Sequence, residues 1–337
     1  MKKIYYIAVV FAILFLAGCG DGIDLPGVNV ETDLNKIPLP DNNVNLEQVE
    51  LKPSTEPMLH EGLHTEEDFQ RIRDKKAAGE EPWVSAYQLL VESQFSQKTA
   101  DTYPTEWIKR GVSGDENYMN AARGATIAYQ QALRWKIEQD DEYAAKAVEN
   151  LNKWVQTCVG VTGNTNLSLA AGLYGYEFAI AGELLRDYEG WDRADFAAFQ
   201  NWLLKVFYPA NDDFLKRHHD TNALHYWANW CLCNIAAKMA IGIVTDRRDI
   251  YNEGIGHLQT GDTNGRLRRA IYHDYAPDYN FAQWQESGRD QGHTLMCVGL
   301  MGVICQLAWS QGDDFFAYDD NLFMRACEYA ACCNYTN

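Results

Sequence analysis

Three polar clusters interrupt a largely apolar chain, and they hold the residue types that bind anions and move protons. The first runs from residue 217 to 230 and reads RHHDTNALHYWANW. If Thr221 or Asn222 caps a helix here, the side chains at 222, 225, 226 and 229 share one helix face. Amides, an imidazole and a phenol on one face predict a sugar-binding surface. The alternative is a capped helix whose tryptophans pack in the core. The candidates are Asn222, His225, Tyr226, Trp227 and Asn229.

The second cluster, residues 264–275, reads NGRLRRAIYHDY and places three arginines within four residues. Arg266 and Tyr272 are the candidates, because a guanidinium and a phenol spaced in this way can reach one substrate. The alternative is a basic face that pairs with surface carboxylates.

The third cluster, residues 283–294, reads QWQESGRDQGHT and directly precedes an apolar run. So many polar groups at the start of a buried helix are hard to explain by folding alone. The alternative is a structural ion pair, such as Glu286 with Arg289. The substrate-binding candidates here are Gln283, Glu286, Arg289 and His293.

The charge of the chain limits its partners. With 47 acidic and 29 basic residues, the net charge is -18, which argues against nucleic acid as a partner. An anionic polymer would need local Arg, Lys and His at its binding site. The spacing of Asp220 with His218 and His219 fits no strong metal motif, so we expect neither a metal nor another cofactor.

Helical spacing of apolar residues dominates from about residue 65 onward, and few segments alternate with a period of two. Thr65 and Asp68 predict a capped start, and Pro82 opens a second helix. The pattern predicts an all-α body, an (α/α) toroid of antiparallel helical hairpins, possibly incomplete at the C-terminus. A TPR-like solenoid is less favoured because no clean 34-residue repeat occurs. The other predicted helices lie near 116–137, 142–158, 168–187, 193–206, 223–244, 247–260, 286–311 and 319–333.

The N-terminus predicts secretion and lipid anchoring. Lys2 and Lys3 precede a short apolar run that ends in LAGC, and this ending resembles a bacterial lipobox. We therefore expect a signal peptide over residues 1–18, lipidation of Cys19, a proline-rich flexible tether over 19–60 and a catalytic body over 61–337. The location would be the bacterial cell envelope, periplasmic or at the outer-membrane surface, with the membrane contacted through the lipid. The other cysteines lie mostly in apolar runs and are expected to be buried free thiols.

The HYWANW stretch from His225, the arginine-rich segment ending in Tyr272 and His273, and the ESGRDQGH motif from Glu286 together resemble the alginate lyase superfamily. The third motif is similar to one in the gut-bacterial branch that degrades alginate or glucuronan. The resemblance covers roughly residues 60 to 337 and implies an α/α-toroid enzyme that cleaves an acidic polysaccharide by β-elimination.

The resemblance also implies catalytic roles. His225 matches a histidine that neutralises the uronate carboxylate, Tyr272 matches the tyrosine that moves the proton, and Arg266 matches an arginine that supports the tyrosine. Arg268 or Arg269 could fill the arginine's role. Many relatives have Asn directly before the histidine, where this chain has Leu224, so Asn222 or Asn229 would supply the amide.

Two other functions remain open from the residues alone. A glycoside hydrolase on the same toroid would use two carboxylates from Glu286, Asp290 and Asp220. A non-catalytic glycan-binding lipoprotein would explain the anchor and the many tryptophans. The concentration of Arg, His and Tyr favours the lyase.

Overall fold

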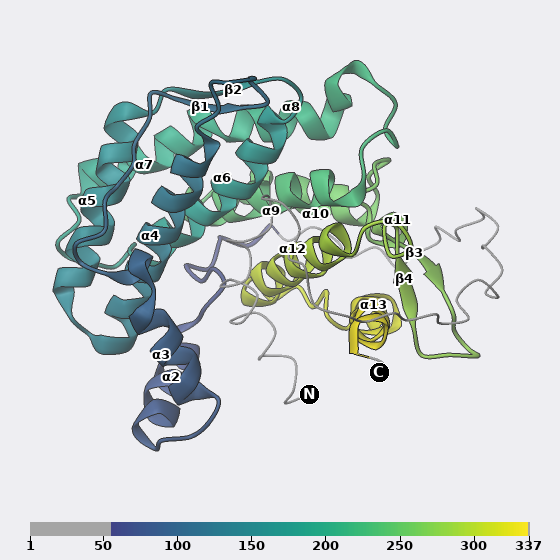
Figure 1. Ribbon diagram of the computed structural model, residues 1–337, viewed down its shortest axis with the longest axis horizontal. Coiled ribbons are helices and arrows are strands. Elements are labelled where there is room, and N and C mark those ends of the chain that lie inside the picture. Colours follow the sequence, from purple (N-terminus) through teal and green to yellow (C-terminus); the bar gives the residue numbers. More distant parts are fainter. Residues whose placement is uncertain (1–54, 336–337) are drawn as a thin grey trace.

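The computed structural model describes residues 55–335, and the chain there is mainly helical (Figure 1). The predicted signal peptide, Cys19 and most of the predicted tether lie outside the described residues. The α-helices are α2 (Glu66–Ala77), α3 (Trp83–Glu92), α4 (Tyr118–Glu138), α5 (Asp141–Thr157), α6 (Leu167–Leu184), α7 (Arg193–Val206), α8 (Tyr208–Arg217), α9 (Ala228–Val244), α10 (Arg248–Gln259), α11 (Leu267–Ala270), α12 (Gln291–Ser310) and α13 (Tyr318–Tyr335).

Polar caps start several of these helices where the sequence predicts them. The Asp68 backbone N–H donates to Thr65 Oγ1 over 3.2 Å, and the Thr65 backbone N–H donates back to Asp68 Oδ2 over 3.0 Å. This reciprocal capping box satisfies two backbone donors that the first turn of α2 would leave unpaired. Helix α8 was not predicted, because Phe214 and Leu215 are the only apolar side chains it buries.

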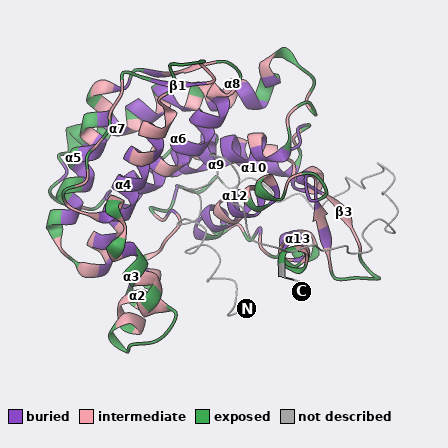
Figure 2. Cartoon of the chain, in the orientation of Figure 1, coloured by how far each residue is buried: buried purple, intermediate pink, exposed green. Residues whose placement is uncertain are grey.

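The core lies between helices α6, α9 and α12 and the helices that pack around them (Figure 2). Nearly every residue of α6 and α9 is buried, because these two helices pack closely against each other. A Cβ added to Gly172 of α6 would lie 2.5 Å from the Cys233 sulfur of α9, so only glycine permits this approach. Helix α12 is long and apolar enough to cross a membrane, but most of it is buried against the rest of the protein.

Helices α6, α9 and α12 all begin at the same end of the body. Ser168, in the first turn of α6, has its hydroxyl 3.0 Å from Nε2 of His219, just ahead of α9. At the start of α9, the Ala228 backbone N–H donates over 3.2 Å to Oε1 of Gln285, which lies shortly before α12. The opposite ends of α6 and α9 also meet, because Arg186 pairs with Asp246 over 3.1 Å. The N-termini of the three helices therefore share one face of the protein.

Residues 55–61 cross the other end of the body, where these helices finish. The Gln311 side-chain amide donates to the carbonyl oxygens of Leu59 and Glu61 over 2.9 and 2.8 Å. The Arg248 guanidinium donates to the carbonyl oxygens of Glu56 and Pro57 over 2.8 and 3.0 Å. The described end of the predicted tether is thus held against α10 and the C-terminal end of α12.

Two short two-stranded sheets are additions that the apolar pattern did not predict. Strands β1 (Trp107–Arg110) and β2 (Gly160–Gly163) pair in parallel. Strands β3 (Ile271–Asp274) and β4 (Ala282–Trp284) form an antiparallel hairpin next to α11 and α13. Strands of three or four residues are too short to show a clear period of two.

The described cysteines carry no disulfide, and five of them, Cys158, Cys231, Cys233, Cys297 and Cys305, are buried free thiols. The prediction of buried thiols is confirmed for these five. Cys332, near the end of α13, is exposed instead.

Candidate active site

A ladder of side-chain amides joins the three polar clusters at the end of the body where α9 and α12 begin. The Asn264 amide donates to the carbonyl oxygens of Leu224 and Tyr226 over 3.1 and 2.8 Å. Its carbonyl oxygen accepts a 2.8 Å hydrogen bond from the amide of Gln285, which in turn accepts from the Ala228 backbone. The segments around residues 225, 265 and 285 are therefore held side by side, as the resemblance implied.

Sequence reasoning did not select Asn264 or Gln285, although both stood inside the quoted clusters. In the sequence, the only indication was that each has an amide side chain next to another notable residue. Asn264 precedes Gly265, and Gln285 precedes Glu286. Asn264 is buried, and its partners lie about 20 and 40 residues away along the chain, so no spacing rule connects them.

The predicted helix start at Thr221 or Asn222 is wrong, because α9 begins at Ala228. Thr221 Oγ1 donates back to the His218 carbonyl over 2.6 Å, and Asn222 Oδ1 accepts from the Leu224 backbone over 3.0 Å. Both polar side chains thus stabilise turns and do not cap the helix. The pre-α9 loop, residues 221–227, replaces the predicted first helical turns, so the proposed shared helix face does not exist.

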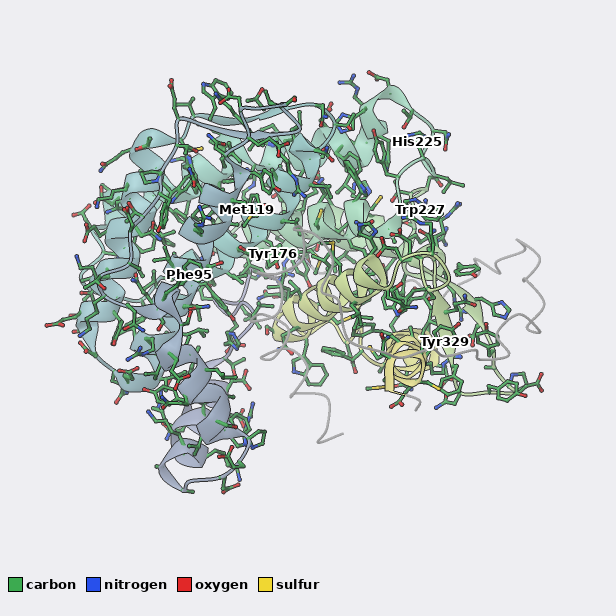
Figure 3. The ribbon with its side chains drawn as sticks, viewed as in Figure 1. Phe95, Met119, Tyr176, His225, Trp227 and Tyr329 are labelled. Atoms are coloured by element: carbon green, nitrogen blue, oxygen red, sulfur yellow. The ribbon has the colours of Figure 1, made fainter. Side chains whose placement is uncertain are left out.

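The pre-α9 loop presents His225 and Trp227 to solvent (Figure 3). The Trp227 side chain is 41% exposed, and the His225 imidazole makes no side-chain hydrogen bond to a described residue. The Tyr226 ring is half-buried and packs 4.7 Å from Trp230, 5.2 Å from Phe214 and edge-on 4.9 Å from the His225 ring. The histidine is therefore available to a substrate, while the tyrosine beside it anchors the loop.

The two candidate asparagines occupy different environments. Asn222 is exposed, with its oxygen engaged in the turn at Leu224. Asn229 is 3% exposed, and its amide faces the sulfur of Met296 at 3.8 Å. The Asn229 oxygen is buried and has no hydrogen-bond partner among the described residues. Asn222 is the one of the two that can meet a polymer without a rearrangement of the core.

Tyr272 sits at a bulge in the β3–β4 hairpin. Ile271 pairs with Trp284 and His273 pairs with the next residue, Gln283, so Tyr272 is the extra residue on its strand. Bulges redirect a side chain away from the regular alternation of a strand. The Tyr272 hydroxyl makes no hydrogen bond to a described residue, and partial burial raises the pKa of its phenol.

Two arginines of the second cluster, Arg266 and Arg268, lie near the start of α13, where both act to lower the pKa of the Tyr318 phenol. Arg268 pairs with Asp274 over 3.2 Å and also contacts the carboxylate of Asp319. The charge of Arg266 acts on Tyr318, where it lowers the pKa of that phenol against the larger effect of burial. Burial is the cause of the raised pKa of Tyr272, so the role of Arg266 in supporting this tyrosine stays a prediction. Arg266 is the N-cap residue of α11, and the chain passes through α11 before it reaches β3.

The third cluster forms a compact turn before α12, which begins at Gln291 and not at Glu286 as predicted. Asp290 is its N-cap and accepts from the His293 backbone N–H over 2.9 Å. Glu286 is 1% exposed, so it has no surface to offer a polymer. Its Oε1 atom contacts the Arg289 guanidinium and lies 3.4 Å from His293 Nδ1. Gln283 accepts a 2.7 Å hydrogen bond from the Tyr275 hydroxyl.

The electrostatics of this end favour an anion. The start of a helix carries a partial positive charge because its first backbone N–H groups lack partners within the helix. Helices α6, α9 and α12 all begin here, next to His225, Arg266 and Arg289. The Asp290 carboxylate already caps α12 and Gln285 accepts from the first N–H of α9, so the exposed Arg289 guanidinium is the main group at this end that attracts a carboxylate.

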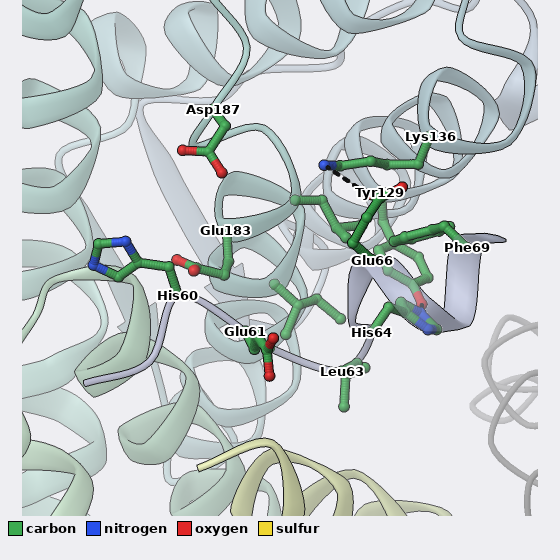
Figure 4. Close-up of a pocket in the computed structure, with 13 residues that line it drawn as sticks. His60, Glu61, Leu63, His64, Glu66, Phe69, Tyr129, Lys136, Glu183 and Asp187 are labelled. Carbon is green, nitrogen blue, oxygen red and sulfur yellow. Dashed lines mark hydrogen bonds and ion pairs between the residues drawn. The ribbon is translucent and has the colours of Figure 1, made fainter. Parts of the chain in front are cut away.

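A separate cavity of about 240 Å³ lies at the opposite end, under residues 60–66 (Figure 4). His64, Tyr129, Lys136 and Glu183 line it, and no predicted site residue does. The His64 ring donates to or accepts from the Tyr129 hydroxyl over 2.6 Å, so this part is a hydrogen-bonded seam between α4 and the segment before α2. Among the described residues, no group of three or more His, Cys, Asp and Glu side chains is arranged to hold a metal ion.

Comparisons with known proteins identify a family and a fold that the chain shares. A family model described as alginate lyase matches residues 72–332. The structure resembles alginate lyase A1-III from Sphingomonas species A1, with a TM-score of 0.57, 13% identity and coverage of 82% of this chain and 80% of that one. It also resembles a tyrosine-to-phenylalanine variant of alginate lyase A1-III complexed with a tetrasaccharide, with a TM-score of 0.55, 12% identity and coverage of 80% and 76%. No curated protein matches the chain. The predicted α/α toroid is confirmed.

Proposed function

The chain belongs to the alginate lyase family, and from this premise we propose that it cleaves alginate by β-elimination, with Tyr272 and His225 as its catalytic residues. Family membership indicates a polysaccharide lyase whose substrate is an acidic polysaccharide. The choice of alginate over glucuronan and the assignment of residues are our proposal. The observation that carries it is the amide ladder of Asn264 and Gln285, which holds the three polar clusters together at the helix N-termini.

The reaction dictates which groups are needed. A uronate lyase removes the proton at C5, next to the carboxylate, and expels the glycosyl oxygen at C4, so a C4–C5 double bond forms. The carbanion that develops at C5 is very unfavourable while the carboxylate keeps its full charge. Donors aimed at the carboxylate in a water-poor site stabilise the charge that moves onto it.

His225 and Arg266 are the proposed donors to the carboxylate. The His225 imidazole is exposed, packs edge-on 4.9 Å from the Tyr226 ring and makes no side-chain hydrogen bond to a described residue, and Asn222 stands three residues before it on the same loop. We assign Arg266 to the substrate carboxylate because it stands two residues after Asn264, whose amide joins the three polar clusters. The nearby helix N-termini add a positive electrostatic potential, which favours the negative charge on the substrate carboxylate.

Tyr272 is the proposed proton-transfer group. Its pKa is raised, so at neutral pH the free protein holds it as a phenol that can donate a proton to the leaving oxygen. To act as the base it first loses its proton to solvent, which a bound substrate and nearby cations favour by stabilising the phenolate. The phenolate then takes the C5 proton and returns it to O4 as the C4–O4 bond breaks. Where C5–H and O4 lie on one face, this single residue serves both steps. Where they lie on opposite faces, His225 takes the C5 proton. The related structure solved as a tyrosine-to-phenylalanine variant with a tetrasaccharide supports a tyrosine in such a role.

The experiment that tests the proposal follows low-ultraviolet absorbance during incubation with alginate, polymannuronate, polyguluronate and glucuronan. Elimination creates a conjugated double bond, whereas hydrolysis does not. We expect absorbance to rise with alginate and Tyr272→Phe to slow it roughly 10²–10⁴-fold. Tyr279→Phe, at a 65% exposed position in the same hairpin, is the matched control and should keep the full rate. Activity on glucuronan alone would transfer the proposal to that polymer.

A hydrolase finds less support in the structure. Glu286 is buried against Arg289 and His293, and Asp220 pairs with Arg217 over 2.7 Å on the surface. Asp290 caps α12 and pairs with His293 over 2.8 Å, so the three carboxylates are held in ion pairs that do not leave two of them free to face a glycosidic bond. New reducing ends without absorbance would nonetheless identify a hydrolase, and polymer binding without either product would identify a binding protein.

We also propose that the protein is a lipoprotein of the bacterial cell envelope, anchored through Cys19, with a tether that ends before residue 56, because residues 56–61 are held against the body. The supporting feature is the LAGC ending of the N-terminal apolar run. Membership of the gut-bacterial branch stays a prediction that rests on the ESGRDQGH motif. Metabolic labelling with a fatty-acid analogue should mark the wild-type protein and not Cys19→Ala, and equal labelling of both would contradict the anchor.

A further inference from the structure

We propose that Arg289 and Trp227 form a binding subsite for a uronate residue that is not itself cleaved, and that the buried Glu286 positions this subsite. The inference rests on the proposed function, since it names how the same active site holds its polymer. It assigns to Glu286 a role different from substrate contact.

The subsite consists of two exposed side chains from different clusters. The Arg289 guanidinium lies over the Trp227 ring, 4.8 Å from the ring centroid. Arg289 is 52% exposed and Trp227 is 41% exposed, so both can be reached from solvent. Such a cation–π contact orients the guanidinium. A flat aromatic surface and a planar cation together match a sugar ring that bears a carboxylate.

Glu286 fixes one part of the arginine and leaves the rest available. Its Oε1 atom contacts Nη2 of Arg289, and neither Nε nor Nη1 has a hydrogen-bond partner among the described residues. A guanidinium presents its donors in a rigid fork that binds a carboxylate with two parallel hydrogen bonds. With one edge held by Glu286, another edge remains free for a uronate.

Burying the Glu286 carboxylate costs free energy, because the charge loses its contact with water. The pair of Glu286 and Arg289 therefore differs from an ordinary ion pair at the surface, where both groups stay hydrated. A carboxylate that is 1% exposed needs a cationic or hydrogen-bonding partner. Arg289 and His293 are the partners of the Glu286 Oε1 atom. The Oε2 atom is buried and has no hydrogen-bond partner among the described residues. Exposed ion pairs contribute little to stability, so folding alone gives little reason to bury one member and expose the other.

Trp227 is held just as firmly. Asn264 binds the Tyr226 carbonyl on one side of it, and Gln285 binds the Ala228 backbone N–H on the other. Gln285 directly precedes Glu286 in the chain, so one short turn positions both halves of the subsite. Rigid support of exposed groups by buried neighbours is what a preorganised binding site requires.

The test compares Arg289→Gln, Arg289→Lys and Glu286→Gln with Arg217→Gln as the control, an arginine of similar exposure that also pairs with acidic residues. Loss of a charge-assisted bidentate contact should raise KM for alginate roughly 10–100-fold while kcat changes by less than about threefold. Arg289→Lys should not restore KM, since lysine lacks the fork. Glu286→Gln should raise KM as well, and the double variant Glu286→Gln/Arg289→Gln should be no worse than Arg289→Gln alone.

Calorimetric titration with an alginate oligosaccharide keeps this inference separate from the proposed function. Weaker binding to Arg289→Gln and unchanged binding to Arg217→Gln are expected even if no elimination is observed. Equal affinity of wild type and Arg289→Gln, or a fall in kcat without a rise in KM, would overturn the subsite. Absence of elimination by the wild-type protein would instead overturn the proposed function. Thermal melting of each variant identifies any loss of folding.

Discussion

The side-chain amide of Asn264 holds the carbonyl oxygen of Tyr226 at 2.8 Å and thereby fixes the loop that carries His225. Asn264→Ala would remove this bond, leave the Gln285 amide without its acceptor and free the loop. We expect the free energy of unfolding to fall by roughly 1–3 kcal/mol, and the elimination rate to fall at least tenfold, because buried partners lose their bonds. Chemical denaturation and the absorbance assay check both effects. Asn201→Ala, on the exposed face of α7, is the control and should change neither.

Substitutions of Arg268 and Arg266 should affect different properties of the protein, stability in the first case and activity in the second. Arg268→Gln breaks the contacts with Asp274 and Asp319 and should lower the free energy of unfolding by roughly 1–3 kcal/mol. Arg266→Gln should instead lower the elimination rate at least tenfold if it neutralises the carboxylate, by loss of one charged donor. Thermal melts and initial rates on both proteins provide the comparison. If Arg269→Gln loses activity while Arg266→Gln keeps it, the assignment moves to Arg269.

Gly172 should tolerate no larger side chain. Gly172→Ala would place a Cβ 2.5 Å from the Cys233 sulfur and 2.9 Å from its backbone, so α6 and α9 would have to move apart. We expect a loss of roughly 1–3 kcal/mol in the free energy of unfolding from overpacking. Gly256→Ala, in α10 with open space around it, should be neutral or stabilising by up to about 1 kcal/mol. Equal melting temperatures for the two variants would contradict this account of the α6–α9 contact.

Acid should weaken the seam between His64 and Tyr129. Burial lowers the pKa of His64 from 6.5 to about 4, against a smaller opposing effect of Asp68. Between these two pH values the unfolded chain binds more protons than the folded one, so the free energy of unfolding decreases as pH falls from about 6.5 to about 4. His64→Gln can still bond to Tyr129 and cannot titrate, so its unfolding free energy should depend less on pH across this window. Urea denaturation at several pH values measures the difference, and identical slopes would contradict the assignment.

Much of the fold could be predicted because helices with buried faces leave a periodic record in the sequence. The bounds of α7 match the prediction, and the capping box at Thr65 was predicted from two residues. The start of α9 could not be placed, because Thr221 and Asn222 have the residue types of a helix cap but use their side chains in turns. Local propensity cannot distinguish these two uses of the same groups.

The candidate site was predicted as three clusters, but their internal geometry was not. That Glu286 is buried and Arg289 exposed depends on how the turn before α12 sits against the pre-α9 loop. The effect of Arg266 on Tyr318 likewise depends on α13, which lies about 50 residues away. Both relationships come from tertiary packing, which the spacing of residues along one segment does not report.

The hold of Gln311 on residues 59 and 61 fixes where the polypeptide enters the body. Helix α12 has 20 residues and separates that entry point from the turn at Glu286 by roughly 30 Å, at about 1.5 Å per residue. A fusion partner, affinity tag or solid support joined through the N-terminal side would therefore sit at the pole opposite the reactive groups. Immobilised in that orientation, the protein should keep the exposed His225, Trp227 and Arg289 accessible to long, viscous polymers.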